Sequence, residues 1–100
     1  MFHAEVKKLI EVQSLSYTEK DQLYRASFSI ALNIAEGSGR FSERDRKNFF
    51  VIARSSVFEC VAILDILKDG SIIDEKEYTD FEAQADELSR MLFGLIRKLG

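Results

Sequence analysis

The sequence predicts an all-α protein, an antiparallel up-down four-helix bundle with a single domain over residues 1–100. Apolar residues recur at alternating spacings of three and four, which keeps them on one face of a helix but would scatter them over both faces of a strand. The chain has no proline and only five glycines, which argues against a many-turned β-sandwich. Short turns separate the four periodic segments, so consecutive helices are expected to pack antiparallel.

The first two predicted helices span about residues 2–13 and 19–36, with a turn at residues 14–17. The first carries an apolar side made of Phe2, Val6, Leu9 and Ile10. The second starts near Thr18 or Asp21 and ends at Gly37, where we expect a left-handed helix end, because a positive φ penalises a Cβ. Its main stripe is Leu23, Ala26, Ser27, Ile30 and Ile34, widened by Tyr24, Phe28, Ala31, Leu32 and Ala35.

The third and fourth predicted helices span about residues 43–68 and 75–99, with Ser42 and Asp74 as N-caps. Glu77 stands where it completes a capping box with Asp74. The fourth helix has one stripe of Tyr78, Phe81, Ala85, Leu88, Leu92, Leu95 and Leu99. The third has two adjoining stripes, Phe49, Ala53, Ser56, Cys60, Ile63 and Leu67 beside Phe50, Val57, Val61 and Leu64. Because this arc covers more than half the helix, we expect a partner to cover it, most simply another copy of the chain.

Composition restricts the classes of function. The formal net charge is −3, with 46% hydrophobic and 31% charged residues, so the chain can form a packed core. One cysteine and one histidine are too few for a disulfide framework or a zinc site, and the serines have no histidine partner, since His3 is expected at a frayed end. We therefore predict no enzyme activity, no metal, no cofactor and no identified small-molecule substrate. Cys60 is predicted to be a core thiol.

The N-terminus mixes charged and apolar residues, unlike a signal peptide, and no segment has the apolar length of a membrane-spanning helix. A cytoplasmic protein without a membrane partner is the expectation, and the free Cys60 thiol fits a reducing compartment.

Two polar features have a functional and a structural interpretation. The Gly37–Arg40 turn could present backbone N–H groups to a phosphate, but it lacks the lysine of a P-loop, and a tight chain reversal is the simpler interpretation. Glu36 and Glu59 lie near the apolar arcs, where carboxylates can form di-metal sites in bundles that also supply Glu-x-x-His motifs. Without those histidines we expect a polar network in which Glu36, Asn33, Arg54 or Ser56 satisfy one another.

Charge is unevenly distributed along the chain. Residues 25–54 carry six basic and three acidic side chains, whereas residues 55–89 carry two basic and ten acidic ones. One outward face of the third helix alternates by three and four through Arg44, Lys47, Val51, Arg54 and Phe58. This face, with Arg40 nearby, has three interpretations: a solvated surface, a subunit interface or a nucleic-acid contact. The acidic isoelectric point of about 5.2 is unusual for a nucleic-acid-binding domain.

The run Ser29-Ile30-Ala31-Leu32-Asn33-Ile34-Ala35-Glu36-Gly37-Ser38-Gly39-Arg40-Phe41-Ser42 resembles the signature of a bacterial family first described from proteins encoded in intervening sequences of 23S ribosomal RNA genes. Phe49–Ser56 followed by Glu59 resembles the third helix of that family, and the resemblance covers about residues 20–100. The matching motif positions are Asn33, Glu36, Gly37, Gly39, Arg40, Ser42, Arg54, Ser56 and Glu59.

The resemblance implies a four-helix bundle that assembles into a ring-like homopentamer. A relative, the accessory protein of diversity-generating retroelements, is a pentamer that binds nucleic acid and a reverse transcriptase. No catalytic residues accompany the family. The expected function is therefore a non-enzymatic, self-assembling accessory or scaffold protein whose partners are its own copies and RNA or a nucleic-acid-processing protein. The alternative is a protein-binding module without nucleic-acid contact.

Overall fold

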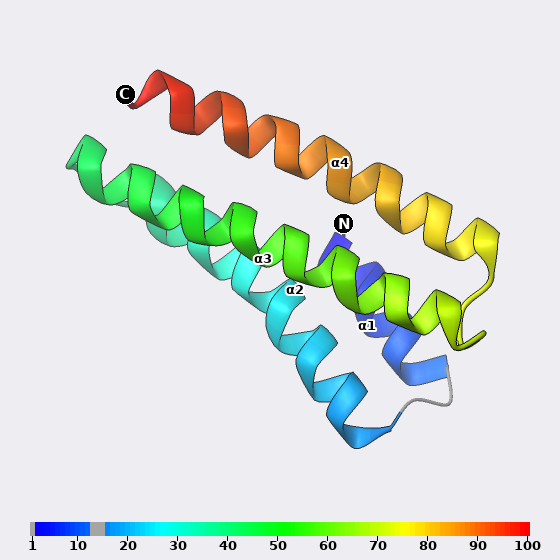
Figure 1. The fold of residues 1–100 in the computed structure, drawn as a ribbon. Coiled ribbons are helices and arrows are strands. Elements are labelled where there is room, and N and C mark those ends of the chain that lie inside the picture. Colours follow the sequence, from blue (N-terminus) through cyan, green and yellow to red (C-terminus); the bar gives the residue numbers. More distant parts are fainter. Residues whose placement is uncertain (1, 13–15) are drawn as a thin grey trace.

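A computed structural model describes residues 2–12 and 16–100, and this part of the chain forms four α-helices (Figure 1). They are α1 (Phe2–Val12), α2 (Tyr17–Ser38), α3 (Glu43–Asp69) and α4 (Glu75–Lys98). Consecutive helices run in opposite directions, and the molecule is elongated, 43 × 22 × 18 Å. The predicted all-α four-helix bundle is confirmed.

The four helices do not pack equivalently. α3 packs against α2 on one side and α4 on the other, whereas the short α1 contacts α2 and α4. The shared core is apolar and draws on every helix, with α3 supplying its largest share, Phe50, Ala53, Val57, Cys60, Leu64 and Leu67. These buried residues come from both stripes expected on this helix, because α3 packs against a neighbour on each side.

The start of α2 differs from the prediction. Ser16 is the N-cap: its hydroxyl accepts a hydrogen bond from Glu19 N at 3.1 Å, and its own N–H donates to Glu19 Oε1 at 2.9 Å. The helix therefore begins at Tyr17, which we expected in a turn. Residues 14 and 15 of the expected turn lie outside the described residues. The Ser-x-x-Glu spacing of this capping box was the overlooked signal.

The two predicted N-caps, Ser42 and Asp74, are confirmed. The Ser42 hydroxyl accepts a hydrogen bond from Asp45 N at 3.3 Å at the start of α3. Asp74 and Glu77 form the reciprocal capping box of α4, with Glu77 N donating to Asp74 Oδ1 at 2.7 Å. Local sequence signals therefore determine where these two helices begin.

The predicted left-handed helix end at Gly37 is wrong. α2 continues through Gly37 to Ser38, and the positive-φ positions among the described residues are Ser71 and Gly100. A Cβ placed on Gly37 would lie 2.7 Å from Cε1 of Phe50 and 3.2 Å from Cβ of Phe49. Glycine at this position thus allows α2 and α3 to approach closely, which a larger residue would prevent.

Apolar side chains also remain exposed on the surface. They lie on α2, α3 and α4 and include Tyr24, Phe28, Leu32, Val51, Ile52, Phe58, Ile66, Met91 and Phe93. Within residues 2–12 and 16–100, no helix combines the length and the hydropathy needed to cross a bilayer.

Candidate nucleic-acid interface

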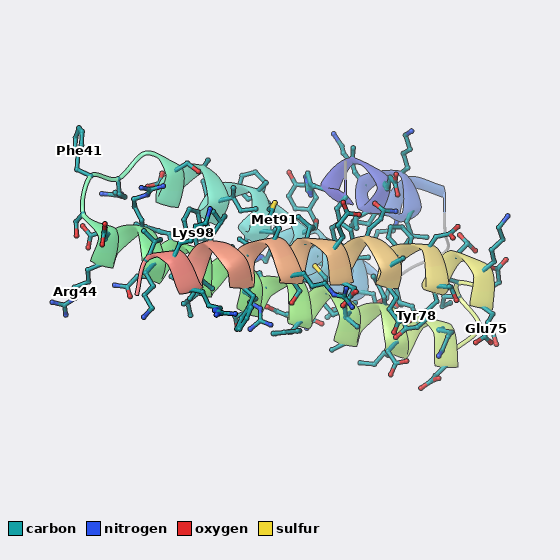
Figure 2. The ribbon with its side chains drawn as sticks, turned by 90° about the horizontal axis from the view of Figure 1, so that it is seen from above. Phe41, Arg44, Glu75, Tyr78, Met91 and Lys98 are labelled. Atoms are coloured by element: carbon teal, nitrogen blue, oxygen red, sulfur yellow. The ribbon has the colours of Figure 1, made fainter. Side chains whose placement is uncertain are left out.

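The charged side chains divide the bundle along its length. Residues 37–58 and 90–100 carry eight basic and two acidic side chains and lie at the end formed by the α2–α3 turn and the α4 C-terminus. Residues 59–89 carry two basic and ten acidic side chains and lie toward the opposite end, which they share with α1 and the first part of α2. Figure 2 shows Arg44 and Lys98 toward one end and Glu75 toward the other. The net charge of −3 therefore conceals a surplus of basic side chains at one end of the bundle.

The basic stripe on α3 is only partly directed toward solvent. Arg44, Val51 and Phe58 are exposed, but Lys47 Nζ donates to the Gly100 carbonyl oxygen at 2.9 Å. Arg54 Nε donates to the carbonyl oxygen and to Oγ of Ser89, both at 3.2 Å. The expectation that the whole stripe faces away from the bundle is wrong, because Lys47 and Arg54 reach across to α4 and the chain end.

Arg54 also lies between two aromatic rings. Its guanidinium carbon is 5.1 Å from the centre of the Phe58 ring and 5.0 Å from that of Phe93, and Arg97 is 5.9 Å from the Phe93 ring. We call Phe58, Arg54, Phe93 and Arg97 the seam ladder, since aromatic rings and guanidinium groups alternate in this order from α3 to α4. Sequence reasoning missed Phe93 and Arg97, because nothing local indicates that they face Arg54; their i, i+4 spacing on one helix was the available signal.

The α2–α3 turn presents a second pair of cation and aromatic ring. Arg40 forms an exposed ion pair with Glu36 at 2.8 Å and lies 4.8 Å from the centre of the Phe49 ring. The neighbouring Phe41 is fully exposed at the tip of the molecule (Figure 2). The N–H of Gly39 is bonded to α2 carbonyls, at 3.1 Å to Ala35 O, so it is not free to hold a phosphate.

The motif residues form a different network from the expected one. Asn33 Nδ2 donates to Ser29 O at 2.8 Å, the hydroxyls of Ser29 and Ser56 are 2.8 Å apart, and Ser56 donates to Ile52 O at 3.1 Å. Glu36 is directed to Arg40 and Glu59 is exposed, so neither joins it. The network links α2 to α3 through Ser29, which sequence reasoning missed, because a serine within a helix carries no distinctive pattern.

The histidine and the cysteine occupy structural positions. His3 is held by a 2.7 Å hydrogen bond between its Nδ1 and the Ser27 hydroxyl and packs against Tyr24 and Phe28, so the expected frayed end is wrong. Cys60 is buried, as predicted, and burial, together with the charge of Glu59, raises the pKa of its thiol to about 12. Over the described ranges 2–12 and 16–100, no three His, Cys, Asp or Glu side chains converge on a metal site.

A groove of about 410 Å³ lies between α2 and α4, beyond the N-terminal end of α1. Its walls are mainly apolar and include Phe2, Ile30, Ala31, Ile34, Leu88 and Met91, with His3, Ser27, Gln84 and Glu87 as the polar members. The groove exists because α1 is shorter than its neighbours and covers only part of the space between them. We call it the α2–α4 groove.

Comparisons with known proteins agree with the fold. A family model described as 23S rRNA-intervening sequence protein matches residues 2–94. A crystal structure of a protein of unknown function from the S23 ribosomal protein family of Bacteroides thetaiotaomicron VPI-5482 is similar, with a TM-score of 0.90 and 22% identity over 95% of this chain and 91% of that chain. At this identity the similarity demonstrates the fold alone. No curated protein matches, and neither description names an enzymatic activity.

Proposed function

Because this chain belongs to the 23S rRNA-intervening sequence protein family, we propose that it is a non-enzymatic, self-assembling accessory or scaffold protein that associates with RNA or a ribonucleoprotein in the cytoplasm. The observation that carries this proposal is the separation of charge into a basic and an acidic half. A polyanion is attracted to the end that holds Arg44 and Lys98, where basic side chains outnumber acidic ones, while most carboxylates lie toward the other end. A local surplus of cations attracts a polyanion although the chain as a whole is acidic.

Exposed apolar surface supports self-assembly. Tyr24, Phe28 and Leu32 follow one another at intervals of four along α2 and remain about half exposed. Val51, Ile52 and Ile66 are also exposed on α3, where Ile66 is 65% exposed. An exposed apolar face such as the one on α2 is typical of protein–protein interfaces. The assembly we propose is a homopentamer, as the family resemblance implies.

Sedimentation velocity tests the assembly. The wild type should sediment with about five times the mass of the 11.5 kDa chain at micromolar concentration. Ile66→Glu should reduce this mass, because it places a charge on the exposed apolar face of α3. Thr79→Glu, at an exposed polar position on α4, is the control that should leave the mass unchanged. A wild-type monomer would contradict the proposed self-assembly.

Salt-dependent binding of structured RNA tests the proposed association with RNA. Arg44→Glu should weaken binding and reduce the dependence of log K on log salt concentration by about one, the change expected when one phosphate contact is lost. Lys76→Glu makes the same charge change in the acidic half and should have little effect. If the wild type binds no RNA at low salt, the protein is the alternative, a protein-binding module without nucleic-acid contact.

A further inference from the structure

We propose that the seam ladder binds unpaired nucleotides of a single-stranded RNA segment, with bases stacking on Phe58 and Phe93 and the cations around them holding the phosphates. This inference rests on the proposed function and deepens it, because it specifies which form of RNA the basic end recognises. A duplex supplies phosphates but keeps its bases stacked on one another, so it cannot use an aromatic platform. Unpaired bases offer their faces to aromatic rings and to guanidinium planes alike.

The composition of the ladder matches that chemistry. Phe58, Arg54, Phe93 and Arg97 place aromatic rings and guanidinium groups in alternation, with successive separations of 5.1, 5.0 and 5.9 Å. Phe58 and Phe93 remain 53% and 46% exposed, so part of each side chain is accessible to a ligand. Rings and guanidinium planes are the two kinds of side chain on which nucleic-acid bases stack.

The ladder is also held in place before any ligand binds. The two hydrogen bonds from Arg54 Nε to Ser89 fix the guanidinium group that lies between the rings. Ser89 is itself buried on α4, and Arg54 is partly buried on α3. Binding therefore loses little additional side-chain entropy, which favours affinity for a flexible strand.

Charge along the seam fits a phosphate backbone. Residues 46–58 of α3 and residues 88–100, which include the last part of α4, contain no acidic side chain, although acidic residues are common elsewhere in the chain. Lys47 and Lys98 belong to the same stretches. A strand that runs along the seam would therefore meet cations on both helices and no carboxylate from either stretch.

Fluorescence anisotropy with a labelled oligouridylate of about twelve nucleotides tests the proposal, with a duplex RNA of equal length as the comparison. The Phe58→Leu/Phe93→Leu double variant keeps apolar bulk but removes both rings, and it should bind the single strand at least about tenfold more weakly. The Phe58→Tyr/Phe93→Tyr double variant keeps the rings and should bind like the wild type. Binding of the duplex should change little in either variant.

Tyr17→Leu provides a matched control, because Tyr17 is an aromatic residue that is 85% exposed but lies at the start of α2, away from the seam. It should leave binding of the strand unchanged, and sedimentation should give every variant the mass of the wild type. Unaltered strand binding by the double leucine variant would overturn the proposal. So would equal affinity of the wild type for strand and duplex, or tighter binding of a DNA strand of the corresponding sequence than of the RNA.

The two levels of the argument fail in different ways. If the wild type binds neither strand nor duplex, the RNA association under the proposed function fails, and the ladder assignment fails with it. If the wild type binds both forms equally and Arg44→Glu weakens both, the proposed function stands and only the stacking inference is overturned. A lower sedimenting mass of the double leucine variant, with the tyrosine variant intact, would instead identify the ladder as a subunit interface.

Discussion

The two sides of α2 are packed in opposite ways. Toward α3 the helices approach so closely at Gly37 that a Cβ would overlap the Phe50 ring, and the hydroxyls of Ser29 and Ser56 bridge the interface. Toward α4, the short α1 fills part of the space, and the α2–α4 groove leaves the rest open. The contrast indicates that one side of the bundle depends on exact side-chain size, whereas the other side tolerates change. The substitutions at Phe50, Gly37 and Ala31 test that difference.

The largest expected difference is between two buried phenylalanines. Phe50→Ala should lower the free energy of unfolding by about 3–5 kcal/mol, because it leaves a cavity between tightly packed helices. Phe2→Ala should cost less, about 1.5–3 kcal/mol, the transfer term alone, since the Phe2 ring borders the open groove and touches the edge of Phe81. Urea denaturation measures both. Equal losses would show that the groove side is packed as tightly as the α3 side.

A pair of glycine substitutions should change stability in opposite directions. Gly37→Ala should destabilise the protein by about 1–3 kcal/mol, because the new methyl group must displace Phe50 or separate α2 from α3. Gly94→Ala, on α4, should stabilise it by about 0.5–1 kcal/mol, since nothing lies within 4 Å of the added Cβ and alanine favours a helix. Thermal unfolding of both variants shows which substitution stabilises the protein and which destabilises it. A stabilised Gly37→Ala variant would contradict the close approach of the helices.

The Gly37 result also marks the limit of what the sequence could predict. The four helices and the caps at Ser42 and Asp74 follow from residues close together in the chain, so periodicity and spacing revealed them. The reason for glycine at 37 lies in Phe50, on the next helix. A left-handed turn and a close helix contact both require glycine, and the sequence alone does not distinguish them.

The candidate site shows the same limit. Arg44 and Phe58 were recognised because they lie on one helix face, and charge counts indicated the basic region. The ladder joins Arg54 to Phe93 and Ser89, which are 39 and 35 positions away, so only the packing of α3 on α4 brings them together. For the same reason the expected network through Glu36 was replaced by one through Ser29.

Filling the groove should have a smaller, favourable effect. Ala31 is exposed and lines the α2–α4 groove, so Ala31→Leu should bury added apolar surface there and raise the free energy of unfolding by about 0.5–1.5 kcal/mol. Ala35→Leu adds the same group one turn later on α2, at an exposed position that is not part of the groove lining, and should change stability little. Chemical denaturation compares the two. An equal gain from both would show that the effect does not come from filling the groove.

The smallest effect concerns the start of α2 and depends on pH. The backbone N–H of Ser16, and then its hydroxyl, lower the pKa of Glu19 below its ordinary value of 4.5, because they favour the charged carboxylate. A carboxyl pKa that is lower in the folded than in the unfolded state stabilises the fold above the unfolded pKa, and this contribution is lost as the pH falls through the folded pKa. The difference in stability between the wild type and Glu19→Gln should therefore be present at neutral pH and shrink as the pH is lowered below about 4.5.

Ser16→Ala, which removes the cap hydroxyl, should instead cost about 1 kcal/mol at neutral pH and retain part of that loss in acid, because the hydroxyl also accepts a hydrogen bond from the backbone N–H of Glu19, which does not titrate. Thermal unfolding of the three proteins between neutral and acid pH measures both differences, and a Glu19→Gln difference that does not change with pH would show that the carboxylate plays no part in capping α2.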